Sequence, residues 1–88
     1  KQPDLFFKKV IENITRLYKQ DFTHGDLSQY NILNHNENPV FIDFSQATTS
    51  KSPMFNELFE RDVRIICTYF SKLKLDIDIK KVINQIKK

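Results

Sequence analysis

The sequence has little glycine and little cysteine, and it has no long apolar run. The single cysteine, Cys67, excludes an intramolecular disulfide and is compatible with a reducing compartment. One cysteine and two histidines also argue against a zinc site. No apolar run approaches the roughly 18 residues that span a membrane, and no secretory signal pattern is visible. We therefore expect a cytoplasmic protein with no membrane partner.

The composition is that of one small folded domain. The chain has 88 residues, of which 40% are hydrophobic, and its formal net charge is only +3. Apolar residues recur throughout, which excludes general disorder. The lysines are scattered, so most of them are interpreted as solvated helix faces, and the charge alone is weak support for an RNA-facing surface. Because the chain starts without Met and enters a helical pattern at once, we expect it to be a piece of a longer protein.

The apolar periodicity predicts an α+β fold that is mainly helical, with one short β-hairpin. Pro3 and Asp4 suit the start of the first helix. Ser52 and Pro53 suit an N-cap and a first helical position in the second half. The expected order begins with a helix over 4–19, an extended piece over 22–24, a loop over 25–30 and a hairpin around the turn-rich segment 34–39. A polar segment over 45–52 and helices over about 53–72 and 77–87 follow, and the last helix is expected to begin after Asp76 or Asp78.

The hairpin brings two polar residues toward its open end. The segment 34–39, "NHNENP", predicts a loop longer than two residues with its midpoint near Glu37. If the strands pair symmetrically about Glu37, Asn31 stands directly opposite Asp43. Cross-strand partners have Cβ atoms roughly 4.5–5.5 Å apart. The pattern therefore predicts an amide oxygen and a carboxylate side by side.

An acid lies close to the apolar stripe of the helix over 53–72. Asp62 comes three residues after Phe59 and four before Ile66. A buried carboxylate needs partners, because burying it unpaired is expensive. We expect Asp62 to accept backbone N–H groups from the polar loop, with a surface ion pair to Arg61 or Arg64 as the alternative.

The stretch "HGDLSQYNIL" and the later "IDFSQ" carry residues suited to phosphoryl transfer from ATP. That reaction needs an Asp beside the acceptor and hard oxygen ligands for Mg²⁺. In protein kinases these groups occur as H-x-D-x-x-x-x-N and D-F-G. Here Asp26, Asn31 and Asp43 occupy the corresponding positions, with the Asp-to-Asn spacing intact. The alternative, that these three only form turns and caps, explains the combined pattern poorly. His24 is interpreted as a core histidine that braces the loop.

These motifs, together with "ERDVRIICTYFSK", resemble the RIO family of atypical protein kinases. As in that family, a helix soon follows Asp43, which leaves no room for an activation segment. The helix motif resembles the second RIO subfamily, where Pro usually stands in place of Ser45. Ser28 replaces the Lys of ordinary protein kinases and the His of small-molecule kinases.

The resemblance implies a kinase C-terminal lobe over 1–88, with a catalytic loop at 24–31 and a metal loop at 43–45. It implies Asp26 as the catalytic Asp, Asn31 and Asp43 as metal ligands, and Asp43 as a potential phospho-acceptor. His24 and Asp62 would support the loop, and Ser28 would lie near the ATP phosphates. The implied cofactors are ATP and Mg²⁺, with Mn²⁺ as another suitable ion. The implied partners are a protein substrate or the protein itself, and the maturing small ribosomal subunit or its rRNA.

Three alternatives stay open. Aminoglycoside and choline kinases share H-G-D-x₄-N and I-D-F, but they usually carry a large helical region after the metal Asp. A small kinase associated with tRNA modification would have Gly after Phe44. A non-catalytic binding module is the third, because this chain has no glycine-rich loop and no strand lysine, which a complete kinase needs. We therefore expect the 88 residues alone to bind ATP weakly or not at all, and to be incomplete and inactive as a kinase.

Overall fold

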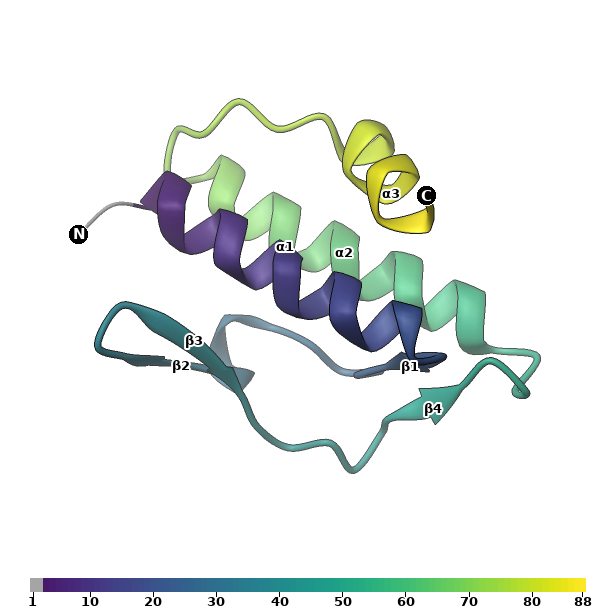
Figure 1. The fold of residues 1–88 in the computed structure, drawn as a ribbon. Coiled ribbons are helices and arrows are strands. Elements are labelled where there is room, and N and C mark those ends of the chain that lie inside the picture. Colours follow the sequence, from purple (N-terminus) through teal and green to yellow (C-terminus); the bar gives the residue numbers. More distant parts are fainter. Residues whose placement is uncertain (1–2) are drawn as a thin grey trace.

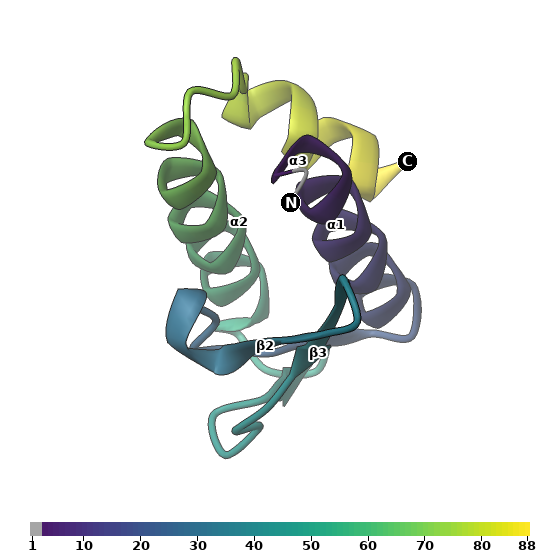
Figure 2. The same cartoon turned by 90° about the vertical axis from the view of Figure 1, so that its left-hand side faces the viewer.

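The computed structural model describes residues 3–88 and shows two long helices that lie side by side and run in opposite directions (Figure 1). They are α1, Pro3–Lys19, and α2, Phe55–Ser71. The shorter α3, Ile79–Lys87, lies across one side of this pair, while the strands and their loops lie on the other (Figure 2). The mainly helical α+β fold is as predicted. No helix within the described residues is long and apolar enough to cross a membrane.

The second helix begins later than the sequence predicts, and the third begins after Asp78, the later of the two expected starts. The Ser52 hydroxyl accepts a hydrogen bond from the Met54 backbone N–H at 3.1 Å, and the Ser52 carbonyl accepts one from the Phe55 N–H at 3.1 Å. Ser52 therefore caps a separate turn, and α2 starts at Phe55 instead of near residue 53. In α3 the Asp78 side chain accepts from the Lys81 N–H at 3.3 Å, which fixes the start at Ile79.

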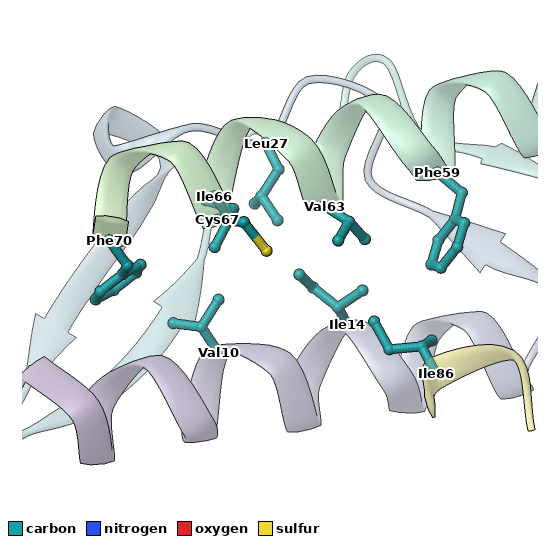
Figure 3. Close-up of a cluster of buried hydrophobic side chains, with 9 residues drawn as sticks. All are labelled: Val10, Ile14, Leu27, Phe59, Val63, Ile66, Cys67, Phe70 and Ile86. Atoms are coloured by element: carbon teal, nitrogen blue, oxygen red, sulfur yellow. The ribbon is translucent and has the colours of Figure 1, made fainter. Parts of the chain in front are cut away.

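The hydrophobic core lies between α1 and α2 and is closed by α3 (Figure 3). The predicted apolar stripes face it, and burying each side chain contributes about 1.5–3 kcal/mol. One member, Leu27, comes from the loop that follows Asp26, and only 1% of its surface is exposed. The core residues are Val10, Ile14, Leu27, Phe59, Val63, Ile66, Cys67, Phe70 and Ile86.

The hairpin is tighter than predicted. It pairs β2, Ile32–His35, with β3, Asn38–Phe41, in an antiparallel register. Only Asn36 and Glu37 form the turn, with φ of 52° and 64°. Left-handed φ at both positions is what a two-residue type I′ turn requires. The prediction of a longer loop was therefore wrong.

The tighter turn shifts the strand pairing by one residue. The Ile42 N–H donates to the Asn31 carbonyl at 2.9 Å, so Asn31 lies opposite Ile42. The prediction that Asn31 stands directly opposite Asp43 was wrong, because it placed the centre of the turn at Glu37 and not between Asn36 and Glu37. Asp43 is the next residue beyond this pair, and it still lies at the open end of the hairpin.

A second small sheet joins the segments on either side of the site. Strand β1, Phe22–Thr23, pairs antiparallel with β4, Thr48–Thr49. The extended piece at 22–24 was predicted, whereas the segment that contains β4 was expected to be irregular. This pairing brings the chain before the 24–31 loop next to the chain after the 43–45 loop.

Candidate active site

The loops over 24–31 and 43–45, which carry the predicted site residues other than Asp62, lie on the strand-and-loop side of the molecule, away from α3 (Figures 1 and 2). Asp26 lies in the loop after β1, and its carboxylate is half exposed. Asn31 ends a short 3₁₀ turn, η1, Gln29–Asn31, and is partly buried. Asp43 is exposed and follows β3. The fold thus brings the two loops that carry these residues to one region.

The buried acid Asp62 holds the 24–31 loop against α2. One of its oxygens, Oδ2, accepts the Gly25 N–H at 2.8 Å and the Thr23 hydroxyl at 3.0 Å. The other, Oδ1, accepts the Leu27 N–H at 3.1 Å. Asp62 is only 1% exposed, so these donors compensate a charge removed from water. The prediction that Asp62 accepts backbone N–H groups from the loop is confirmed.

His24 is also buried, and both of its ring nitrogens are engaged. Nδ1 accepts the Asp26 N–H at 3.2 Å, so Nε2 carries the proton and donates to the Ile42 carbonyl at 2.7 Å. This arrangement specifies the neutral tautomer. His24 therefore links the two loops, as expected of a core histidine that braces the site.

The backbone of Gly25 contacts the segment after the metal loop. Gly25 has φ of +89°, and a Cβ built there would overlap the Gln46 carbonyl. Only glycine combines this φ with so close an approach of two backbones. The single glycine of the chain is therefore required where the two loops meet.

The 43–45 loop is fixed by short-range contacts. Asp43 has a left-handed φ of 60°, which is uncommon for a residue other than glycine. The Ser45 hydroxyl donates to Asp43 Oδ1 at 2.9 Å, which orients the carboxylate. The Phe44 ring packs on His24 with ring centroids 4.7 Å apart. The contacts orient the Asp43 side chain at the surface, where a ligand can reach it.

Asn31 has one side-chain atom in use and one available. Its Nδ2 donates to the Asp26 carbonyl at 2.8 Å, which leaves Oδ1 as an acceptor or metal ligand. Within residues 3–88 no three His, Cys, Asp or Glu side chains come together to hold a metal ion. One amide oxygen and one carboxylate nevertheless suit Mg²⁺, which takes few protein ligands and completes its shell with water and phosphate oxygens. The donor set fits that ion.

Three contributors were not predicted. Thr23 and Leu27 anchor the loop. The only sequence signal for Thr23 is that it is a β-branched residue at the end of a strand, and the only one for Leu27 is that it is an apolar residue between two polar ones. Arg61 was considered as a partner for Asp62, but its Nη2 lies 3.7 Å from Asp26 Oδ1. Ser28, expected near the ATP phosphates, caps η1 by accepting the Tyr30 N–H at 3.2 Å.

Other features of the fold lie outside the site. Burial raises the pKa of the Cys67 thiol from 9.0 to about 11, so this core cysteine is not a nucleophile at neutral pH. An open groove of about 400 Å³ runs between α1, η1 and the end of α2, but its lining includes none of Asp26, Asn31 and Asp43. The site is therefore an exposed surface in this chain.

Comparisons with known proteins agree on one family. A family model described as the RIO domain matches residues 1–82. The chain is 41% identical over 76 residues to the RIO-type serine/threonine-protein kinase Rio1 of Methanocaldococcus jannaschii, which covers 85% of this chain and 26% of that protein. It is 37% identical over 91 residues to Rio2 of the same organism, which covers 97% of this chain and 33% of that one. The chain thus spans a third or less of these relatives.

Two solved structures of a Rio2 kinase from Chaetomium thermophilum are similar in fold. One superposes with a TM-score of 0.68 at 30% identity, covering 78% of this chain and 24% of that one. The other, a complex with ADP, Mg²⁺ and a phosphoaspartate, has a TM-score of 0.73 at 26% identity, covering 91% of this chain and 29% of that one. Because relatives of both Rio1 and Rio2 type match, membership of the second subfamily stays a prediction.

Proposed function

Because the chain belongs to the RIO domain family, we propose that it is the C-terminal lobe of a RIO-type serine/threonine protein kinase that transfers the γ-phosphate of ATP. The observation that carries the proposal is that the fold holds the Asp26 backbone rigidly and leaves its carboxylate exposed. His24 and Asn31 bind the N–H and carbonyl of Asp26. An acid presented in this way can reach a hydroxyl on an incoming substrate.

The proposed reaction needs little covalent chemistry from the protein. The acceptor oxygen attacks the γ-phosphorus, and the bond from that phosphorus to the β–γ bridging oxygen breaks. The electron pair leaves with ADP, and the hydroxyl proton passes to Asp26. Asp26 also orients the hydroxyl before transfer, so positioning and proton acceptance are its two roles.

Asn31 and Asp43 would hold Mg²⁺ in the proposed complex. When bound, the ion neutralises charge on the phosphate oxygens. Asn31 presents its Oδ1, while Asp43 presents the carboxylate that the Ser45 hydroxyl orients. The ADP and Mg²⁺ in the Chaetomium thermophilum Rio2 complex support this assignment. The phosphoaspartate of that complex likewise supports Asp43 as a phospho-acceptor in this chain.

The finer parts of the proposal concern the whole protein. The part of it that precedes this lobe would supply the remaining phosphate and adenine contacts. The substrates would be a serine on another protein or on the kinase itself. The names of the relatives support a protein kinase, and by resemblance the pathway would be maturation of the small ribosomal subunit in the cytoplasm. ATP hydrolysis without a protein acceptor is part of the same proposal.

The test is Mg²⁺-dependent transfer of labelled γ-phosphate by the full-length polypeptide. Asp26→Asn should abolish transfer and leave the fold intact, because the carboxylate is exposed. Asp76→Asn, the same change at an exposed position between α2 and α3, is the matched control and should retain full activity. Label on protein, lost only in Asp26→Asn, supports a protein kinase.

Three other results would contradict the proposal. Label found only on a small alcohol acceptor would indicate a small-molecule phosphotransferase instead. No label and no nucleotide binding would indicate a binding module. Unchanged transfer by Asp26→Asn would show that Asp26 is not the catalytic residue.

A further inference from the structure

The side chain of Arg61 reaches the proposed catalytic residue from α2. Its Nη2 lies 3.7 Å from Asp26 Oδ1, and the two side chains are 52% and 50% exposed. This separation is longer than a hydrogen bond, which rarely exceeds about 3.2 Å. An exposed and loose ion pair of this kind contributes little to stability. Arg61 therefore lies near Asp26 but does not form a hydrogen bond with it.

The position of Arg61 follows from its neighbour in the sequence. Asp62 binds the Gly25 and Leu27 N–H groups, on either side of Asp26. These bonds fix α2 against the loop at the point where Arg61 leaves the helix. The guanidinium is thus placed beside Asp26 by buried hydrogen bonds, although the guanidinium itself lies at the surface.

The chain around the site has no positive charge of its own. Between Lys19 and Lys51 the sequence contains no Lys and no Arg, and this segment carries both site loops and the hairpin. Ser28 occupies the position where ordinary protein kinases carry a lysine, and its hydroxyl is used to cap η1. Lys9, which contacts the hairpin, binds the Glu37 carbonyl at the turn, at the far end from Asp43. Apart from the Mg²⁺ that Asn31 and Asp43 would hold, a Lys or Arg side chain that contacts the transferred phosphate must therefore come from outside this segment.

We propose that Arg61 supplies this cation: it leaves Asp26 when substrates bind and contacts the oxygens of the transferred phosphoryl group. The inference rests on the proposed function. As the acceptor oxygen bonds to the γ-phosphorus and the bond to the ADP oxygen breaks, the acceptor proton moves to Asp26. Arg61 neutralises charge on the equatorial oxygens and makes or breaks no covalent bond. Its planar fork of donors suits such oxygens.

The pair has a second consequence for the resting protein. While Arg61 lies beside Asp26, the carboxylate is electrostatically satisfied and the guanidinium stays within reach of an incoming phosphate. Because exposed pairs are weak, exchanging a carboxylate partner for a phosphate partner opposes catalysis very little. The same residue thereby lies beside Asp26 before binding and contacts phosphate afterwards.

The test compares three full-length variants: Arg61→Gln, Arg61→Lys and Arg64→Gln. Arg64 is exposed on the same helix, and among residues 3–88 it forms no ion pair with Asp26, so its replacement provides the same loss of charge without loss of that pair. For Arg61→Gln we expect kcat to fall about 10²–10³-fold, with KM for ATP changed less than about threefold, as for loss of one preorganised donor. Arg61→Lys should recover part of the rate, and Arg64→Gln should match the wild type.

A binding measurement separates this role from a structural one. Aluminium fluoride with ADP mimics the transferred phosphoryl group, so it should raise ADP affinity in the wild type and in Arg64→Gln. In Arg61→Gln that increase should be lost while affinity for ADP alone is unchanged. A merely structural Arg61 would change the melting temperature and leave the ratio of the two affinities intact.

The outcomes are distinguishable. If Arg61→Gln transfers phosphate at the same rate as the wild type, the inference is overturned and the proposed function still stands. Equal losses in Arg61→Gln and Arg64→Gln would also overturn it, because net charge would then explain both. Absence of transfer in the wild type would refute the proposed function, and the inference with it.

Discussion

Replacing Asp62 by asparagine should destabilise the fold, because it places two hydrogen-bond donors opposite each other in a buried site. Asp62 Oδ2 accepts two hydrogen bonds, from Thr23 and Gly25, whereas Oδ1 accepts one from Leu27. The new amide will keep its oxygen at the position with two donors. Its NH₂ group then faces the Leu27 N–H, so two donors oppose each other in a site that is 1% exposed.

The magnitude follows from these bonds. Losing a hydrogen bond to a charged acceptor costs about 1.5–3 kcal/mol, and the two remaining bonds become weaker because the acceptor is neutral. We expect Asp62→Asn to lower the free energy of unfolding by about 2–4 kcal/mol. Asp62→Ala leaves two buried backbone N–H groups unpaired and should cost about 3–6 kcal/mol.

Urea unfolding followed by circular dichroism measures this difference. Asp76→Asn makes the same chemical change at an exposed position and should shift the free energy of unfolding by no more than about 0.5 kcal/mol. If Asp62→Asn unfolds at the same urea concentration as Asp76→Asn, the three hydrogen bonds do not hold the loop. The account of how the site is positioned would then be wrong.

Three further results are expected. Gly25→Ala should lower the free energy of unfolding by at least about 2 kcal/mol, because the added Cβ meets the Gln46 carbonyl and φ is +89°; an unchanged urea midpoint would contradict this. Burial raises the pKa of Cys67 to about 11, so between pH 9 and 11 the unfolded chain loses the thiol proton while the folded chain keeps it. Stability should therefore fall as pH rises through this window, by up to about 2.7 kcal/mol more than in Cys67→Ala, and equal pH slopes by urea titration would refute the assignment. In the full-length protein Asp43→Asn should abolish Mg²⁺-dependent ADP binding, measured by titration calorimetry with and without the ion, and retained Mg²⁺ dependence would remove Asp43 from the metal site.

Periodic features of the sequence predicted the fold well. Apolar residues that recur at helical spacing identified the buried faces of α1 and α2, because burying such a stripe is the main reason these segments are helical. The same periodicity placed Asp62 beside the core. Since a carboxylate in that position needs donors, and the nearby loop has unpaired N–H groups, its partners were predicted from the sequence as well.

Features that depend on one residue of register were not predicted. The turn at Asn36 and Glu37 lacks the Asn-Gly or Asp-Gly pair that usually indicates a two-residue hairpin. The predicted strand pairing was therefore displaced by one residue from the pairing in the structure. Tertiary contacts were missed for a different reason. Nothing local to Leu27 shows that it enters the core, and nothing local to Arg61 shows which acid its guanidinium approaches, since both depend on how α2 meets the loop.

In this site the groups that hold the loop in place are different from the carboxylate proposed to act on the substrate. The contacts that hold the loop use the backbone of Asp26 and the side chains of Asp62 and His24. Within residues 3–88 the Asp26 carboxylate accepts no hydrogen bond, and its ion pair with Arg61 is loose. The fold would therefore tolerate a neutral residue at position 26. Proton transfer from an acceptor hydroxyl requires an exposed acid held in this way, so this separation agrees with the proposed function.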